Sequence, residues 1–224
     1  MDSGQSWKSL SLFHVEYPSG DRFGKFLAYT SMAPIFIAVS LITLIGWRRD
    51  LHTIFYFCGC LLNEISNFFL KSLISQPRPF PSVHPSVGSS GMPSNHAQFM
   101  GFFCAYFALF LYIRLNQKSC CRETKGLIFL IFLLLTVVVC YSRVYLLYHT
   151  FSQVLVGVTV GGVSAVIWFL LVQHIVTPIF PWISDSWIGH LLMLQDFTHI
   201  NNIVKFEYIN AQNHIRRTKF ERPM

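Results

Sequence analysis

The stretch GLIFLIFLLLTVVVCYSRVYLLYHTFSQ, residues 126–153, decides the class of fold. Its first sixteen residues, up to Tyr141, contain no charged side chain and no proline, as expected of a helix in a bilayer. Arg143 and His149 follow directly, so reactive side chains stand where that helix would leave the apolar layer. Four more apolar segments lie at about 27–47, 51–70, 98–115 and 154–175. The sequence predicts an all-α fold, a polytopic bundle of five or six transmembrane helices.

The composition of the whole chain agrees with a membrane protein. Of its 224 residues, 53% are hydrophobic and 12% are charged, whereas a soluble domain has about 25% charged residues. This composition excludes a soluble globular enzyme, and it excludes disorder, which requires low hydrophobicity. We attribute the net charge of +7 to membrane topology and lipid headgroups, and we expect no nucleic-acid partner. The six cysteines show no metal-site spacing and are interpreted as small buried residues.

The distribution of lysine and arginine predicts the orientation of the bundle. With five spans, one side receives 11 of these residues, in 48–50, in 114–125 and after 176, and the other side receives 6. The positive-inside rule places the richer side in the cytosol. The loops 71–97 and 142–153 then face the lumen, so their polar residues lie at the luminal membrane boundary.

The same pattern suggests three regions. They are a luminal N-terminal segment (1–26), a transmembrane domain (27–178) that would carry the activity, and an interfacial segment followed by a basic cytosolic tail (179–224). Within the last region, 182–197 is apolar but interrupted by Asp185, His190 and Asp196. We expect an interfacial helix there, although a sixth span stays open.

Three clusters of polar residues lie on the predicted luminal side. Three cations in such a set suit a tetrahedral oxyanion, because guanidinium groups bind two phosphate oxygens at once. A helix start adds unpaired backbone N–H groups that favour an anion. The clusters are Lys71 and Arg78 in K-x6-RP, then Ser94, Asn95 and His96 in PSNH, and finally Arg143, His149 and Gln153 in SR-x5-H-x3-Q.

The two histidines of these clusters fit covalent phosphoryl transfer. A neutral imidazole can attack phosphorus while a protonated one donates to the leaving oxygen. We assign His149 as the nucleophile and His96 as the acid that later activates water. On a helix Gln153 would share a face with His149, so its carbonyl could accept the Nδ1–H and leave Nε2 to attack.

The scarcity of acidic residues on the predicted luminal side indicates a reaction without a metal or other cofactor. Between Lys71 and Gln153 the sequence has one acidic residue, Glu123, and it falls on the predicted cytosolic side. Two-metal phosphatases need several carboxylates around their ions. We therefore expect no metal ligand set on the luminal face. His84 in the same loop has no partner at a telling spacing and is interpreted as structural.

Glu64 lies inside the second apolar segment, where a charge is costly. Glu64, Asn67 and Lys71 follow an i, i+3, i+7 pattern and form a polar stripe on one helix face. One interpretation is hydrogen bonding between helices. The other is that Glu64 positions Lys71 or an arginine from within the bundle. Single cations and histidines at a membrane border are often mere anchors, but three clusters on one side favour a site.

The three clusters resemble the signature of the type 2 phosphatidic-acid phosphatase superfamily, K-x6-RP, PSGH and SR-x5-H-x3-D. The resemblance implies a helical, metal-independent phosphatase that works through a phosphohistidine. It implies that Lys71, Arg78 and Arg143 hold the phosphate with Ser94 and the Asn95 backbone, and that His96 and His149 react. Two positions depart from the pattern, since Asn95 stands for glycine and Gln153 for aspartate. Asn tolerates unusual backbone angles, and a neutral amide stabilises a cationic His149 less than a carboxylate would.

Within that superfamily the likeness is to the branch that acts on dolichyl and other polyprenyl diphosphates. It runs through HVEYPSGD, GMPS-x-H-x-QFM, YSRVYLLYHT-x-SQV and FEY, and so covers nearly the whole chain. The implied activity removes the terminal phosphate of dolichyl diphosphate at the luminal face of the endoplasmic reticulum and recycles the lipid carrier of protein N-glycosylation. A phosphatase for phosphatidate or another lipid phosphate is the alternative, and a lipid-phosphate carrier is a third hypothesis. Prenyl chain length and oligomeric state are not predicted.

Overall fold

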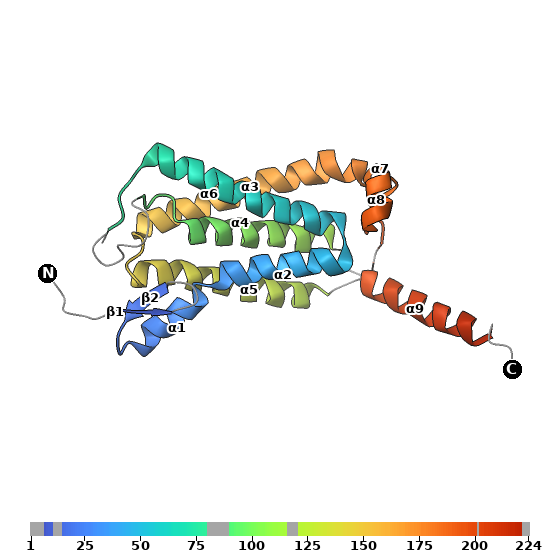
Figure 1. The fold of residues 1–224 in the computed structure, drawn as a ribbon, viewed down its shortest axis with the longest axis horizontal. Helices are drawn as coiled ribbons and strands as arrows, with labels where there is room; N and C mark the ends of the chain where they lie inside the picture. Colours follow the sequence, from blue (N-terminus) through green and yellow to red (C-terminus); the bar gives the residue numbers. More distant parts are fainter. Residues whose placement is uncertain (1–6, 11–14, 80–89, 116–120, 201, 221–224) are drawn as a thin grey trace.

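The computed structural model describes residues 7–10, 15–79, 90–115, 121–200 and 202–220. Within these residues, five helical segments are long and apolar enough to cross a membrane, and they run side by side in one bundle (Figure 1). The predicted helical membrane bundle is thereby confirmed.

The elements follow the chain from the hairpin at the N-terminus to the basic helix at the C-terminus. They are β1 (Trp7–Leu10), β2 (Val15–Pro18), α1 (Arg22–Thr30), α2 (Ala33–Arg48), α3 (Leu51–Ile74), α4 (Asn95–Leu109), η1 (Phe110–Arg114), α5 (Arg122–Tyr145), α6 (Phe151–Leu171), η2 (Val172–Val176), η3 (Thr177–Ile179), α7 (Phe180–Ser184), α8 (Trp187–Leu192) and α9 (Ile203–Phe220).

The N-terminal segment contains structure that the hydropathy pattern did not indicate. Strands β1 and β2 pair antiparallel, and Val15 of β2 is buried in a cluster with Leu27, Ala28 and Leu146. The hairpin and α1 therefore pack against the end of α5. The first span also breaks where one helix was expected, because α1 ends at Thr30 and α2 begins at Ala33, with two residues between them and a proline in the first turn of α2.

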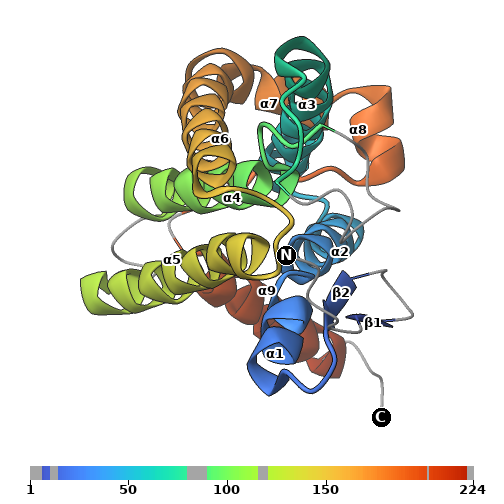
Figure 2. The same cartoon turned by 90° about the vertical axis from the view of Figure 1, so that its left-hand side faces the viewer.

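Helix α4 is the centre of the bundle. It lies between α3 and α6 on one side and α5 on the other (Figure 2), and more of it is buried than of any other spanning helix. Its contact with α6 is very close, since a Cβ atom at Gly157 or Gly161 would collide with the α4 backbone. Small residues four apart allow such backbone approach between membrane helices. This close contact places the start of α4, which carries His96, beside the start of α6, which His149 precedes by two residues.

The segment 182–197 does not form a sixth span. It folds into α7 and α8, of 5 and 6 residues, whereas a spanning helix needs about 20. Three tryptophans at this end of the bundle are highly exposed, Trp47 at 87%, Trp182 at 75% and Trp187 at 76%. Exposed tryptophans concentrate at membrane–water interfaces, so the two short helices fit an interfacial position.

Candidate active site

All three predicted clusters lie at one end of the bundle, the left end in Figure 1. There α3 and α5 end while α4 and α6 begin, so residues distant in sequence come together. Lys71 lies in the last turn of α3, and Arg143 lies in the last turn of α5. Ser94 is the N-cap residue of α4, and Gln153 lies in the first turn of α6. His149 lies in the short connection between α5 and α6.

The hydrogen bonds of His149 determine its tautomer. Nε2 lies 3.3 Å from a guanidinium nitrogen of Arg78, and Nδ1 lies 3.2 Å from Oε1 of Gln153. Because a guanidinium only donates, Nε2 must accept through its lone pair, and Nδ1 carries the hydrogen. The ring thus presents an unprotonated Nε2 toward the cations.

The side chain of Gln153 is held in one orientation. Its Oε1 also accepts from the Thr150 backbone N–H at 3.3 Å, and its Nε2 donates to the Pro77 carbonyl at 3.0 Å. The Thr150 hydroxyl oxygen accepts a hydrogen bond from the Gln153 backbone N–H, and the two contacts together form a capping box. The main-chain carbonyl of Gln153 also accepts a hydrogen bond from the Ser94 N–H at 3.1 Å. Gln153 therefore connects all three clusters.

Arg143 is held by an aromatic ring that sequence reasoning missed. It is buried, and its guanidinium carbon lies 3.9 Å from the ring centroid of Tyr148, a cation–π contact. The Tyr148 carbonyl accepts from Arg78 at 3.1 Å, and its hydroxyl accepts from the Glu16 N–H at 2.9 Å. Its place beside His149 was the one available signal, and that does not distinguish it from the other tyrosines nearby.

Three buried atoms at or near the start of α4 have no hydrogen-bond partner among the described residues, namely Ser94 Oγ, Asn95 Oδ1 and Arg143 Nε. Buried polar groups are nearly always satisfied, so such atoms require an explanation. Ser94 caps α4 without using its side chain. The groups whose charge acts on the His96 ring are Arg143, His149, Lys71 and Arg78. The arrangement offers donors and positive charge to an anion beside both imidazoles.

Glu64 contacts side chains of this site, whereas the Asn67 amide reaches only the main-chain carbonyl of Pro93, at 3.4 Å. The Glu64 carboxylate accepts a hydrogen bond from the Asn95 side chain and attracts the Lys71 ammonium group. The shorter hydrogen bond of the Asn67 amide is donated to Oε1 of Gln98 at 2.7 Å, within the contact between α3 and α4. Asn95 starts the helix, and its φ is not positive, so the asparagine makes a side-chain contact here that glycine could not make.

The electrostatics of the loop residues follow from this crowding of cations. Burial, together with Arg143 and Arg78, lowers the pKa of His149 to about 3, against the opposing effect of the hydrogen bond that His149 donates to Gln153. Burial lowers the pKa of Arg78, which still remains a cation. The imidazole of His149 is therefore neutral at physiological pH, the form that a nucleophile requires.

In the described part of the chain no three His, Cys, Asp or Glu side chains are grouped so as to hold a metal ion. His84 falls in the segment 80–89, outside the described residues.

The chain resembles known proteins over most of its length. Residues 52–176 match the model of the PAP2 superfamily. The chain is 44% identical to dolichyldiphosphatase 1 of Homo sapiens, over 91% of this chain and 87% of that protein. It is 38% identical to lipid phosphate phosphatase gamma of Arabidopsis thaliana, over 93% of this chain and 92% of that protein.

The fold also resembles a solved structure, the PAP2-type phosphatidylglycerolphosphate phosphatase of Bacillus subtilis. The TM-score is 0.56 at 20% identity, covering 68% of this chain and 78% of that one. At this identity the likeness concerns the fold alone. The relatives and the family model together establish a membrane hydrolase of lipid phosphates. The chain belongs to the PAP2 superfamily and, within it, to the dolichyldiphosphatase family of multi-pass phosphoanhydride hydrolases.

Proposed function

We propose that the chain removes the terminal phosphate of dolichyl or another polyprenyl diphosphate through a phosphohistidine on His149. The observation that carries the proposal is the acceptor role of His149 Nε2 toward Arg78. A donor-only partner requires a free lone pair at that nitrogen, and the Gln153 contact holds the hydrogen on the other one.

In the proposed first step, Nε2 of His149 attacks the terminal phosphorus in line with the bridging oxygen. The bond from phosphorus to that oxygen breaks, and polyprenyl monophosphate leaves with a proton from His96. The negative charge of the phosphoryl oxygens is neutralised by Lys71, Arg78 and Arg143. The Ser94 hydroxyl donates a hydrogen bond to one of these oxygens. Electrostatic stabilisation and positioning of this kind are the main sources of catalysis in phosphoryl transfer.

In the second step, His96 takes a proton from water, and the water oxygen attacks the phosphorus. The bond between phosphorus and Nε2 breaks, which releases inorganic phosphate and restores neutral His149. Gln153 keeps the hydrogen on Nδ1 throughout, and the positive charge on the phosphorylated ring is balanced by the phosphoryl oxygens. We propose that Glu64 orients the amide of Asn95 and the Lys71 ammonium group within the same site.

The intermediate can be tested by trapping. Rapid quenching with base after mixing with radiolabelled polyprenyl diphosphate should leave label on His149, since phosphohistidine survives base and is lost in acid. His149→Asn should abolish the label and turnover, whereas His96→Asn should slow both formation and decay of the label. Full turnover by His149→Asn, or label at another residue, would refute the assignment.

The substrate is supported by the names of the relatives, but those names differ. Several relatives are named dolichyldiphosphatase, whereas the Arabidopsis relative is named a lipid phosphate phosphatase. Comparing kcat/KM for dolichyl diphosphate and phosphatidate in the same detergent decides between them. We expect a preference for the diphosphate, and a preference for phosphatidate would favour the alternative.

We further propose that the site faces the lumen of the endoplasmic reticulum and recycles the carrier lipid of N-glycosylation. The charge distribution supports this orientation, because the end of the bundle opposite the histidines carries more lysine and arginine. Cys121 is exposed and lies on the predicted cytosolic side, so the test uses a chain with Cys120 and Cys121 replaced by serine. In that chain a cysteine introduced at Ser152, which is exposed at the catalytic end, should react with an impermeant reagent only after the microsomes are opened. Labelling in intact microsomes would invert the proposed topology.

A further inference from the structure

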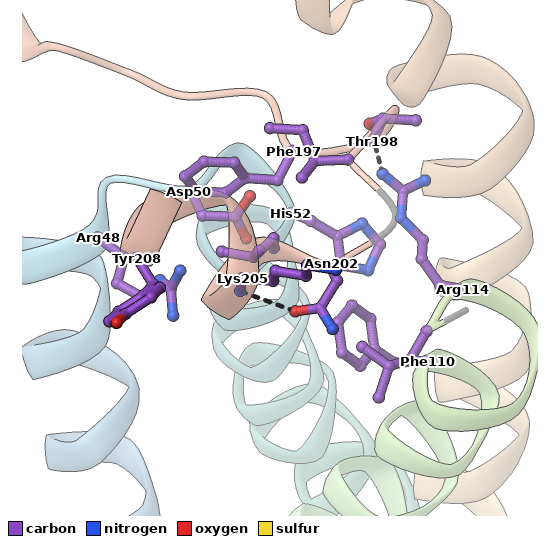
Figure 3. A pocket seen from close by; sticks show the side chains of 13 residues that line it. Arg48, Asp50, His52, Phe110, Arg114, Phe197, Thr198, Asn202, Lys205 and Tyr208 are labelled. Atoms are coloured by element: carbon purple, nitrogen blue, oxygen red, sulfur yellow. Dashed lines mark hydrogen bonds between the residues drawn. The ribbon is translucent and has the colours of Figure 1, made fainter. Parts of the chain in front are cut away.

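A second cavity lies at the end of the bundle opposite the histidines, where α2, α3 and η1 meet the C-terminal segment (Figure 3). Its volume is about 690 Å³. Nothing in the proposed reaction uses it.

The C-terminal segment is bound to the bundle and forms one wall of this cavity. The Leu51 N–H donates to the Gln195 carbonyl at 3.1 Å, and the Gln195 N–H donates to the Arg49 carbonyl at 2.9 Å. Further along, Arg48 pairs with Glu207 of α9 at 2.7 Å. The segment after α8 is thus a fixed part of the structure, where a simple basic tail was expected.

Three cations line the cavity, Arg48, Arg114 and Lys205. Arg114 is bound by neutral oxygens only, those of Gln173 and Thr177 at 3.0 and 3.2 Å and of Thr198 at 2.6 Å. Among the described residues neither Arg114 nor Lys205 has a carboxylate within ion-pair distance. Both retain the charge and N–H groups needed for an anion.

The carboxylates in the neighbourhood are already engaged. Asp50, which lines the cavity, caps α3 by accepting from the Thr53 N–H at 2.9 Å and the Thr53 hydroxyl at 2.8 Å. Asp196 lies outside the lining and accepts from Thr198, and Glu207 holds Arg48. The lining itself therefore has three cations and one anion, and the anion is committed to a helix cap.

A buried histidine in the lining points to a ligand independently of these charges. His52 is 4% exposed, and its Nε2 contacts the Tyr106 hydroxyl at 3.3 Å. Its Nδ1 has no partner among the described residues. A buried ring nitrogen left in this way is costly unless something binds it. His52 lies among the cavity-lining side chains beside Asn202 and Arg114 (Figure 3).

Beside the polar Thr198 and Asn202, most of the remaining lining is apolar and includes Phe110, Leu115, Phe197 and Ile203. The tryptophans Trp47, Trp182 and Trp187 at the same end indicate the level of a membrane interface. A ligand that combines an anionic headgroup with apolar chains matches both halves of the lining. A volume of about 690 Å³ is in the range of small-molecule sites.

We propose that this cavity binds the phosphodiester headgroup of a phospholipid from the leaflet opposite the catalytic end. The phosphate lies between Arg114 and Lys205 and accepts from His52 Nδ1–H, and the acyl chains leave past the apolar lining. A soluble phosphodiester has the same recognition chemistry, so the test must distinguish the two sources.

The test is native mass spectrometry of the full chain in detergent, with phosphatidylglycerol, diacylglycerol or water-soluble glycerophosphoglycerol added. Excess vanadate occupies the catalytic site throughout. We expect one phosphatidylglycerol retained and little diacylglycerol, which lacks the phosphate. Retention of glycerophosphoglycerol alone would assign the site to a soluble phosphodiester. Equal retention of diacylglycerol, or no retention of any of the three, would overturn the proposal.

Variants locate the binding. Lys205→Gln and Arg114→Gln should each weaken phosphatidylglycerol binding at least about tenfold, whereas Arg217→Gln, exposed further along α9, should leave it unchanged. All three should hydrolyse substrate as the wild type does, which verifies folding at the catalytic end. If Arg114→Gln loses folding with its bonds to Thr198, Lys205→Gln still decides, because its side chain has no ion pair to lose among the described residues. Unchanged binding by Lys205→Gln would refute the site.

Discussion

Replacing Tyr148 by leucine should impair catalysis, although the side chain has no assigned chemical role. Its ring lies 3.9 Å from the guanidinium carbon of Arg143 and is 3% exposed, so the cation–π contact is desolvated and contributes about 2 kcal/mol. If the stabilisation that Arg143 gives the phosphoryl group in the transition state falls by the same free energy, kcat/KM falls about 30-fold, since each 1.36 kcal/mol is a factor of ten. Inhibition by vanadate, a tetrahedral anion, should weaken in parallel.

Tyr148→Phe is the matched control. It keeps the ring over Arg143 and removes only the hydroxyl that accepts from the Glu16 N–H at 2.9 Å, a loss of about 0.5–1.5 kcal/mol in unfolding free energy. Phosphate release and vanadate inhibition should remain within about threefold of wild type. Full activity in the leucine variant would refute the reasoning. So would equal loss in both variants, which would assign the effect to the hairpin contact instead.

Three other perturbations test the rest of the architecture. Turnover should persist in excess chelator, because the described residues offer no metal-ligand group, and recovery only on adding Mg²⁺ would contradict this. Gly161→Ala should cost about 1–3 kcal/mol of stability through collision with the Gln98 backbone, whereas Gly162→Ala, with open space around it, should be neutral or slightly stabilising. Equal changes in Tm for the two variants would contradict the role assigned to the close contact between α4 and α6. Acidification should destabilise the protein: the pKa of His149 is about 3 folded and 6.5 as its ordinary value, so the unfolded chain binds more protons between those values. Stability is then lost as pH falls from 6.5 toward 3, and His149→Gln should flatten part of that loss in thermal unfolding curves.

The hydropathy pattern was sufficient to predict the five spans and which loops share one end. Residue spacing was sufficient to propose Arg78, His96 and His149 as partners, and in the structure Arg78 contacts His149 while His96 stands at the start of α4, within the field of both. Their chemical roles remain predictions until variants are measured.

Features that depend on contacts between distant segments were not predictable from local patterns. Glu16 and Tyr148 are 132 residues apart, and no periodicity in either segment indicates their hydrogen bond. The docking of the C-terminal segment on Leu51 depends on backbone groups of Gln195, which any sequence would supply. The asparagine at position 95 was interpreted through backbone freedom, whereas its contact with Glu64 involves the side chain.

The glycine seam between α4 and α6 has a consequence for protein engineering. Because the spacing of α4 and α6 is set by backbone contact at Gly157 and Gly161, a chimera that exchanges only residues 80–89 and keeps Pro77, Arg78 and Ser94 should retain the arrangement of the reacting groups.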